Sequence, residues 1–390
     1  MKKITSSGLS RGLRAIGPAL GMMAATALVS IAGATAASAQ EAAQPRFKLA
    51  IVGLAHGHSF IEFRTLAKKT AVEVVAISDV DPALREQVAA LFPSAKIYEN
   101  HRQLLDEVKP DGVWSFDDNS QHLAITRLCA ERGISVMFEK PMATNYADAV
   151  AMRDLAKKHG IQIVINSQPP WLRANHTAEQ LAKSGELGKV WRVHTVSGHN
   201  GPGPGTSGRM VNTAFWSMLN DEKRGGGVLL DFGPYGAAWV RLHLGLPETV
   251  YAVRAHTRQD VYKVPTTTTI IASYPDHRIG IIEASWDLPR NSEQVEIFGD
   301  EGSVDLVSNS GNQLIRLEAW KGTEKREVTP AVLDPKWSDA ATYFATAVRQ
   351  KNVDEFLSPA FHADVMAILE AAKRSADTGK PVALKTVIRR

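Results

Sequence analysis

The chain has 390 residues, of which 44% are hydrophobic and 22% are charged, and this ordinary globular composition excludes a disordered or fibrous protein. The formal net charge is +4, but Lys2, Lys3, Arg11 and Arg14 account for all of it, because residues 1–40 contain no Asp or Glu. The remainder carries no net charge, which excludes the basic surface that a nucleic-acid-binding protein needs. The length is enough for about two domains with full hydrophobic cores.

The first forty residues have the parts of a secretory signal peptide. A basic start precedes an apolar stretch over residues 15–36, and the Ala-Ser-Ala triplet at 37–39 is a typical cleavage site. We therefore predict a signal peptide over residues 1–39 and a periplasmic or secreted protein that is not attached to the membrane after cleavage. An uncleaved membrane anchor is the alternative, because the apolar stretch approaches the length that spans a bilayer. Arg11 and Arg14 are not adjacent, which suggests export of the unfolded chain.

From residue 46 onward, short apolar runs alternate with helical patterns. The runs that we predict as strands are 47–53, 72–78, 96–98, 112–116, 135–138 and 161–165. The segments that we predict as helices are 58–69, 82–91, 101–108, 120–132 and 146–159. Strands that alternate with helices are typical of βαβ units, so we expect a Rossmann domain with a parallel sheet over residues 46–167.

The pattern changes after about residue 167. The β-rich runs are 190–197, 249–256, 266–274, 278–286 and 294–298, with no helix predicted between them, and two helical stretches, 338–350 and 359–378, close the chain. We therefore expect an α+β domain over residues 168–390 with a large, mostly antiparallel sheet, for substrate binding and oligomerisation. Its C-terminal helices could pack back on the Rossmann domain. The Gly/Pro-rich segment 199–208 is either a lid over the substrate or a plain surface connection.

The single cysteine, Cys129, lies in a stretch with helical periodicity. It excludes an intrachain disulfide, and we expect it to pack as a small hydrophobic residue. We predict no metal site.

The first group of residues with a chemical meaning lies where the first predicted strand turns into a helix. Gly53 matches the first glycine of the dinucleotide pattern G-x-G-x-x-G, Ala55 and His58 stand at its second and third glycines, and His56 and Gly57 lie between them. The backbone of such a turn lies against the pyrophosphate, and a histidine can add a side-chain hydrogen bond. An ordinary glycine turn that opens a helix is the alternative.

Asp79 ends the second predicted strand about twenty residues after this turn. A carboxylate there accepts hydrogen bonds from the ribose hydroxyls of NAD and repels the 2′-phosphate of NADP, so we expect NAD as the cofactor, with NADP less favoured. The alternative role is helix capping, which Asp81 before Pro82 fills better.

Three further segments carry a family resemblance. They are Glu139-Lys140-Pro141 after the fifth predicted strand, Asn119-Ser120-Gln121-His122 after the fourth, and the run G-G-G-V-L-L-D-F-G-P-Y over 225–235. Together with the Rossmann start, they resemble the Gfo/Idh/MocA family of oxidoreductases over nearly all of the chain after the signal. The resemblance implies that Lys140 lies beside the nicotinamide and the substrate hydroxyl, that Asn119, His122, Glu139 and Pro141 line the cofactor site, and that the protein is a homodimer or homotetramer.

The resemblance also implies that the enzyme oxidises or reduces a secondary hydroxyl of a sugar, glycoside or cyclitol. Oxidation removes a hydride from carbon and a proton from oxygen, so the site needs a base at the hydroxyl. We expect Tyr235 to be that base, with its pKa lowered by the charge of Lys140, and Asp231 to orient Lys140 or the sugar. Asp231 and Tyr235 are four residues apart, so on a helical turn they share one face.

Candidate sugar contacts are Arg173, His199 and Trp216, because aromatic rings stack on sugar faces and Arg or His binds hydroxyls. The chain departs from the family pattern at Asp118, where relatives have proline, and Asp117-Asp118 puts two acids near the expected cofactor edge.

Two other functions remain open. In an NAD-dependent glycosidase, the bound cofactor transiently oxidises a ring hydroxyl and the glycosidic bond leaves by elimination. Export favours this function, because the periplasm supplies no free NAD. A non-catalytic sugar-binding protein that has lost its cofactor is the other, and the imperfect glycine pattern supports it.

Overall fold

The computed structural model describes residues 45–69, 71–167, 171–202, 213–309, 312–319 and 325–388. The predicted signal peptide lies outside these ranges, as does most of the Gly/Pro-rich segment. Residues Phe47–Arg390 form one compact unit. Among the described residues, no helix is both long enough and apolar enough to cross a membrane.

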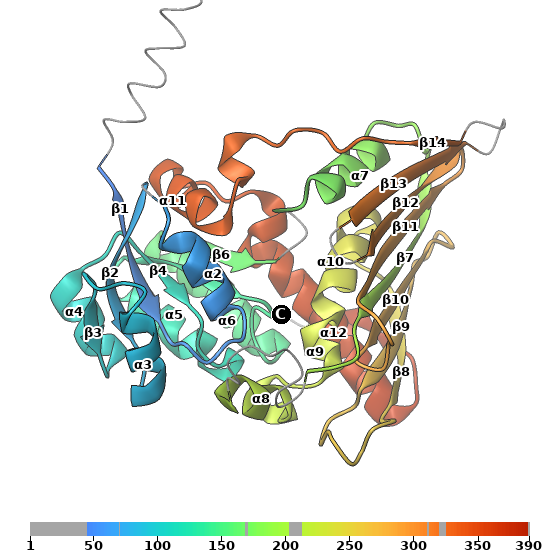
Figure 1. Ribbon diagram of the computed structural model, residues 1–390. Coiled ribbons are helices and arrows are strands. Elements are labelled where there is room, and N and C mark those ends of the chain that lie inside the picture. Colours follow the sequence, from blue (N-terminus) through green and yellow to red (C-terminus); the bar gives the residue numbers. More distant parts are fainter. Residues whose placement is uncertain are drawn as a thin grey trace, which may run out of the picture. The chain divides into compact units, whose positions relative to one another are not determined.

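A six-stranded sheet forms the first half of this unit (Figure 1). Its strands are β1 (Phe47–Val52), β2 (Val72–Ser78), β3 (Lys96–Tyr98), β4 (Gly112–Ser115), β5 (Ser135–Glu139) and β6 (Ile163–Asn166). All neighbours pair in parallel in the order β3-β2-β1-β4-β5-β6, which confirms the expected Rossmann sheet. The order reverses between β1 and β4, and ligands of such sheets bind at the carboxyl ends of the strands at this point.

Helices connect these strands, and local chemistry sets their ends. They are α2 (Ser59–Leu66), α3 (Pro82–Ala89), α4 (His101–Val108), α5 (His122–Ala130), which follows the 3₁₀ helix η1 (Asn119–Gln121), and α6 (Tyr146–His159). Asn145 caps α6 by accepting a hydrogen bond from the backbone N–H of Asp148, and Gly160 ends it in the left-handed conformation. Both ends of α6 are therefore as the sequence predicts.

A nine-stranded sheet forms the second half, in the order β14-β13-β12-β11-β7-β10-β9-β8-β15. Its strands are β7 (Val190–Gly198), β8 (Thr249–Ala255), β9 (Thr267–Ser273), β10 (Ile279–Ser285), β11 (Ser292–Gly299), β12 (Gly302–Asn309), β13 (Asn312–Ala319), β14 (Lys325–Glu327) and β15 (Val382–Ala383). The pair β7 and β10 is parallel and the other described pairs are antiparallel, which confirms a mostly antiparallel sheet.

The second half has more helices than expected. They are α7 (Arg173–Lys183), α8 (Thr213–Leu219), α9 (Val228–Asp231), α10 (Gly233–Leu244), α11 (Ala340–Gln350) and α12 (Pro359–Thr378). The expectation that no helix lies between the runs 190–197 and 249–256 is wrong, because α8, α9 and α10 lie there. Helix α10 is almost wholly buried against β7 and β10, so it is apolar on nearly every side and has no amphipathic period that would reveal it.

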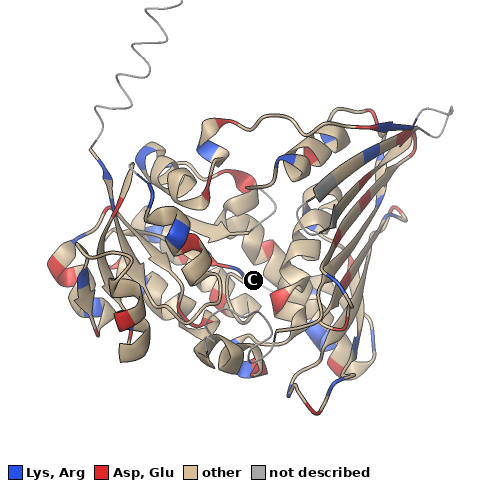
Figure 2. Cartoon of the chain, viewed as in Figure 1, with Lys and Arg blue, Asp and Glu red and all other residues tan. Residues whose placement is uncertain are grey.

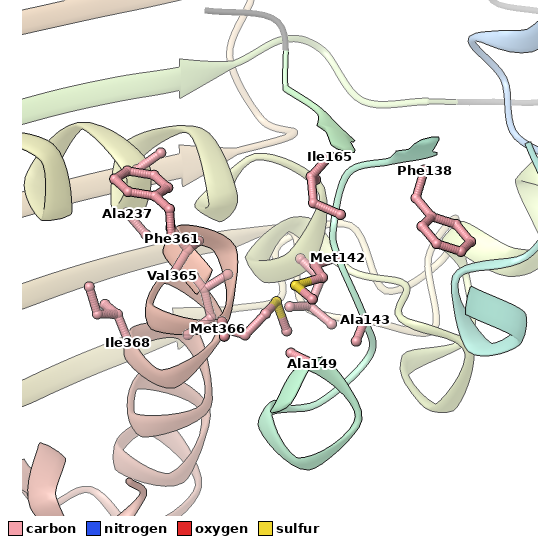
Figure 3. Close-up of a cluster of buried hydrophobic side chains, with 14 of the residues drawn as sticks. Phe138, Met142, Ala143, Ala149, Ile165, Ala237, Phe361, Val365, Met366 and Ile368 are labelled. Atoms are coloured by element: carbon pink, nitrogen blue, oxygen red, sulfur yellow. The ribbon is translucent and has the colours of Figure 1, made fainter. Parts of the chain in front are cut away.

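One hydrophobic core joins the two halves. Helix α12 packs against α6 of the first half and against β8 and α10 of the second. Figure 3 shows this junction, where Met142, Ala143 and Ala149 of the first half face Val365 and Met366 of α12. This junction thereby brings the carboxyl end of β5 next to α9, where Lys140 meets Asp231. Acidic and basic residues are interspersed over both halves (Figure 2).

Candidate active site

Lys140 follows β5, and its side chain reaches α9. Its Nζ donates hydrogen bonds to Oδ1 of Asp231 at 2.7 Å and to the backbone oxygen of Asp231 at 2.8 Å. The same nitrogen lies 5.0 Å from the ring centre of Tyr235 and 5.9 Å from that of Phe232. The structure therefore brings together the three residues expected to be catalytic, and Lys140 is only 3% exposed.

Asp231 and Tyr235 both face Lys140, as expected of two residues on one face, although they lie in two successive helices. Helix α9 ends at Asp231, the chain bends at Phe232, and α10 starts with Gly233 and Pro234. Pro234 has no backbone N–H to donate, so it fits the first turn of α10 and not the interior of a longer helix. Both side chains reach Lys140 because the two short helices meet at this bend.

Trp286 is a member of the cluster that the sequence analysis missed. It follows β10, is fully buried, and donates a hydrogen bond from Nε1 to Oδ2 of Asp231 at 2.9 Å. Lys140 and Trp286 thus hold one carboxylate oxygen each. Trp286 is far from Asp231 in sequence, and no local motif marks it.

The cluster has defined protonation states. Burial alone would lower the pKa of Lys140, but the carboxylate of Asp231 and the nearby Tyr235 outweigh burial and raise it. Burial alone would raise the pKa of Asp231, but Lys140 and Trp286 hold it below its usual value. At neutral pH the pair is therefore an ammonium and a carboxylate.

The pKa of Tyr235 shifts in the direction opposite to the one expected. Burial raises the pKa of its hydroxyl, and the charge of Lys140 lowers it by less, so the net shift is upward. The expectation of a tyrosine with a lowered pKa is wrong in direction, because burial outweighs the positive charge of Lys140, which the carboxylate of Asp231 also offsets. Tyr235 is a neutral hydroxyl that can donate a hydrogen bond.

His199 lies beside this cluster, at the end of β7. Its ring centre is 5.0 Å from that of Phe232, and its Nδ1 accepts a hydrogen bond from the backbone N–H of Gly201 at 2.8 Å. Burial lowers the pKa of His199, so the ring is neutral and carries its proton on Nε2. That N–H is a hydrogen-bond donor at the edge of the cluster.

Of the other two candidate sugar contacts, Trp216 is connected to the cluster through aromatic packing and Arg173 is not. The ring of Trp216 on α8 lies 5.5 Å from that of Tyr262, which in turn packs on Trp286. Arg173 is exposed and donates to the backbone oxygens of residues 330 and 331, so its described contacts are structural and lie outside the cluster.

The turn after β1 requires glycine at position 53 and is held by the carboxylate of Asp79. Gly53 has φ +77°, and a Cβ on it would collide with Asp117. The carboxylate of Asp79 accepts hydrogen bonds from the backbone N–H groups of Leu54 at 2.6 Å and Asp81 at 2.7 Å. Asp79 therefore fixes the turn, while Asp81 caps α3. Burial raises the pKa of Asp79.

Gly57, which is out of step with the dinucleotide pattern, has a different reason to be glycine. A Cβ on it would lie 2.5 Å from the ring of Phe215 on α8, and the ring centre of Phe215 is 4.9 Å from that of His56. Helix α8 of the second half therefore packs on the turn, next to Ala55 and His56, which are both buried.

Glu139 of the E-K-P tripeptide is fully buried and holds the turn from the other side. It accepts hydrogen bonds from Nδ1 of His58 at 2.9 Å, Nδ2 of Asn166 at 2.7 Å and Nε1 of Trp114 at 3.3 Å. The next peptide bond, between Lys140 and Pro141, is cis. His58 thus uses its Nδ1 within the chain.

His56, His58 and Glu139 are also the group of described residues that could hold a metal ion, since one ligand atom of each lies within 4.8 Å of the others. The backbone N–H of His58 donates to Nδ1 of His56 at 3.3 Å, and the ring of His58 donates to Glu139. Hydrogen bonds within the chain therefore already involve Nδ1 of both histidines and one carboxylate oxygen of Glu139.

Asn119 and His122, after β4, leave two buried acceptors without a partner among the described residues. Nδ1 of His122 donates to the backbone oxygen of Met142 at 3.1 Å, and burial lowers the pKa of the ring, so Nε2 is an unprotonated acceptor. Nε2 of His122 and Oδ1 of Asn119 are buried and unpaired. With the turn at Gly53 and the acid at the end of β2, this site fits a nicotinamide dinucleotide.

The two acids that depart from the family pattern are both paired. Asp117 binds Nε2 of His101 at 3.0 Å, and Asp118 binds Arg224 at 2.5 Å while it caps η1. Arg224 therefore balances the charge of Asp118, and Asp117 has a hydrogen-bonding partner within the chain.

Comparisons with known proteins agree with this geometry. Residues 47–167 match the family described as "Oxidoreductase family, NAD-binding Rossmann fold", and residues 175–305 match "GFO/IDH/MocA C-terminal domain". The D-xylose 1-dehydrogenase (NADP(+)) 2 of Haloferax volcanii is 26% identical over 318 residues, which are 80% of this chain and 92% of that protein. The D-glucoside 3-dehydrogenase of Escherichia coli is 26% identical over 215 residues, which are 55% of this chain and 58% of that protein.

The fold has close counterparts among solved structures. An oxidoreductase from Agrobacterium radiobacter, in complex with NAD+, L-tartaric acid and magnesium, superposes with a TM-score of 0.74 at 18% identity, over 88% of this chain and 100% of that chain. The family matches cover both halves of the unit described above, and the named relatives are dehydrogenases. The chain belongs to the Gfo/Idh/MocA family and is an NAD(P)-dependent oxidoreductase.

Proposed function

We propose that the protein transfers a hydride between a nicotinamide cofactor and a secondary hydroxyl carbon of a sugar, glycoside or cyclitol. The observation that carries this proposal is the buried Lys140–Asp231 ion pair, with the hydroxyl of Tyr235 and the Nε2–H of His199 beside it. This set of donors suits an oxygen that alternates between carbonyl and alkoxide character. The relatives named for D-xylose and D-glucoside support a carbohydrate substrate.

The protonation states favour one direction at neutral pH. The bound nicotinamide supplies or accepts the hydride, and the chain handles the proton. Because the pKa values of Lys140 and Tyr235 are both raised, the resting site holds donors and lacks a free base. Reduction of a keto group therefore proceeds from the resting state, with Lys140 or Tyr235 giving its proton to the new alkoxide. Oxidation needs one of these protons to leave, so its rate rises toward alkaline pH.

We propose NAD as the preferred cofactor, because Asp79 directly follows β2, where a carboxylate in a Rossmann fold typically binds the ribose hydroxyls and repels a 2′-phosphate. Arg85 donates to the backbone oxygen of Asp79 at 2.7 Å and is the nearby cation that could bind that phosphate. Arg85 also pairs with Glu99 at 2.9 Å, which reduces its attraction for phosphate. Titration with NAD and with NADP decides between the two, and tighter binding of NADP would contradict the preference.

We also propose that the protein works in the periplasm or outside the cell, because of the signal pattern in residues 1–39. A homo-oligomer is proposed through the face of the nine-stranded sheet that no described helix covers (Figure 1). Val253 and Ile271, on that face, are 50% and 39% exposed. Light scattering coupled to size-exclusion chromatography tests the oligomer, and a monomer would overturn it.

The central experiment has two readouts. A mass spectrum of the purified protein identifies any nucleotide that it retains, and absorbance at 340 nm then follows turnover with a panel of pentoses, hexoses, methyl glycosides and inositols. We expect nucleotide binding and reversible formation of NAD(P)H with at least one class. Absence of nucleotide binding at millimolar concentration would overturn the proposal. Cleavage of a nitrophenyl glycoside without net NADH formation would instead identify the NAD-dependent glycosidase.

A further inference from the structure

A second cavity lies away from the catalytic cluster. It has a volume of about 350 Å³ and is enclosed by α7, α10 and the 3₁₀ helices η4 (Pro335–Trp337) and η5 (Glu355–Leu357). None of Lys140, Asp231 and Tyr235 lines it. Its size is within the range of small-molecule sites.

Part of its wall is aromatic. Trp239 of α10, Trp337 and Phe356 line the cavity from three different elements. Trp239 is stacked on His243, with an interplanar angle of 12°, which fixes the orientation of the indole. Trp337 is likewise stacked on Tyr343, at 23°. Rigid aromatic walls of this kind provide apolar contact at a low cost in conformational entropy.

The polar part of the wall includes the amide of Asn175. Asn175 of α7 is only 8% exposed and lines the cavity. Its side-chain amide makes no hydrogen bond to another described residue, so its two donors and its acceptor are open to the cavity. An amide placed in this way can bind the hydroxyl groups of a ligand.

The wall presents no free cation among the described residues. Its lysine, Lys183, pairs with Glu179 at 2.6 Å, and Asp354 pairs with Lys336 at 3.1 Å. Glu355 is exposed and 3.9 Å from Arg241, whose closer partner is Asp364 at 2.8 Å. The described part of the wall therefore offers no unpaired lysine or arginine to attract an anion.

A neutral molecule with an apolar face and several hydroxyls matches this wall. We propose that the cavity binds a neutral sugar ring, in addition to the ring that reacts at Lys140. Tyr235, Trp239 and Leu242 are spaced i, i+4, i+7 along α10, so they lie on one helix face, and the cavity begins about 6 Å beyond Tyr235 along the axis. The ring is either the distal unit of an extended substrate or a separate free sugar.

The test measures sugar binding without the reaction. Methyl glucoside, maltose and cellobiose are titrated into the full protein by calorimetry in the absence of nucleotide, with Lys140→Met as the background that disables the catalytic cluster. We expect at least one of the three to bind, and Asn175→Ala and Trp239→Ala to weaken that binding about tenfold or more. Asn175→Ala removes no side-chain hydrogen bond to another described residue, so we expect little effect on folding, which thermal unfolding checks. Trp191→Ala, on β7 outside the cavity, is the matched control and should bind as the parent does.

Kinetics then separate the two sources of the ring. If the ring is part of the substrate, Asn175→Ala raises KM for a disaccharide and leaves KM for its monosaccharide unchanged. If the sugar is separate, both KM values are unchanged while calorimetric binding is lost. The proposal is overturned if neither variant changes sugar binding, or if none of the three sugars binds at tens of millimolar. Because binding is measured in a catalytically disabled protein, these outcomes do not depend on the proposed reaction.

Discussion

The buried polar groups of the catalytic cluster are paired within the chain, whereas two near the cofactor turn at Gly53 have no partner among the described residues. At the cluster, Lys140 and Trp286 hold both carboxylate oxygens of Asp231 within the chain. Near the turn, Oδ1 of Asn119 and Nε2 of His122 are buried without a partner among the described residues. An unpaired buried acceptor costs free energy, so the cofactor side is completed by a ligand, whereas the cluster is organised before any ligand arrives.

The largest expected effect comes from breaking the ion pair of the catalytic cluster. Lys140→Met leaves Asp231 without its cation and removes one of the two candidate proton donors, so we expect kcat to fall about 1000-fold, or roughly 4 kcal/mol in activation free energy. Nucleotide affinity should change much less, because the unpaired acceptors of the cofactor side are untouched. Steady-state kinetics and nucleotide titration measure the two quantities. Lys157→Met, an exposed lysine of α6, is the control, and an equal loss of kcat there would contradict the assignment.

The next effect comes from the cofactor turn. Gly53→Ala forces a Cβ against Asp117 in a left-handed conformation, so we expect nucleotide affinity to fall about 30-fold, or roughly 2 kcal/mol. Gly133→Ala is a close control, because Gly133 also has a positive φ but no atom stands within 4 Å of the added Cβ. Calorimetric titration compares the two variants. Equal affinities would show that the turn does not contact the nucleotide.

A smaller effect tests how Asp231 is held. Trp286→Phe removes the N–H that donates to Oδ2 of Asp231 and keeps an aromatic ring, so we expect a loss of about tenfold in kcat. The hydrogen bond from Trp286 helps to lower the pKa of Asp231, so its removal raises that pKa. The acid limb of the pH–rate profile should therefore move to higher pH. A residue that only fills space would lower stability and leave the profile in place.

The last effect is on stability and not on rate or binding, and it concerns the cofactor side. Burial, with the charge of Glu139, raises the pKa of Glu62 on α2 from 4.5 to about 7. The folded state therefore holds a proton that the unfolded chain releases, and wild-type stability falls as pH rises from 4.5 to 7. Glu62→Gln removes this loss, so its gain in unfolding free energy should be near zero at pH 4 and about 2 kcal/mol above pH 7. Denaturant unfolding at both values measures it, and a gain that is the same at pH 4 and pH 8 would contradict this origin.

Much of the first half could be predicted from the sequence because its signals are local. The alternation of apolar runs with helical patterns predicted β1 to β6. The pattern of strand, glycine turn, second strand and acid predicted that Gly53 and Asp79 lie together. The second half could be predicted less well. Helix α10 has no polar face, and β12 and β13 escaped recognition. The hydrogen bond from Trp286 to Asp231 depends on how β10 pairs in the sheet, which no local motif encodes.

Among the cofactor and catalytic residues, the sequence likewise predicted identities better than properties that depend on the three-dimensional surroundings. The family resemblance led to Lys140, Asp231 and Tyr235, which the structure brings together. It could not give the direction of the pKa shift of Tyr235, because that depends on burial and on how completely Asp231 balances Lys140. Gly57 had no explanation in the sequence because the ring that it accommodates, Phe215, comes from the other half of the chain.

The shared core around α12 has a mechanical consequence. Because one helix packs on α6 of the first half and on β8 and α10 of the second, pulling the two sheets apart would expose the residues drawn in Figure 3 to water. A hinge between the halves would therefore be costly, and the two sheets should melt together in a single calorimetric transition. The hydrogen bond between Lys140 and Asp231 joins the same two halves, so its geometry depends on this shared core.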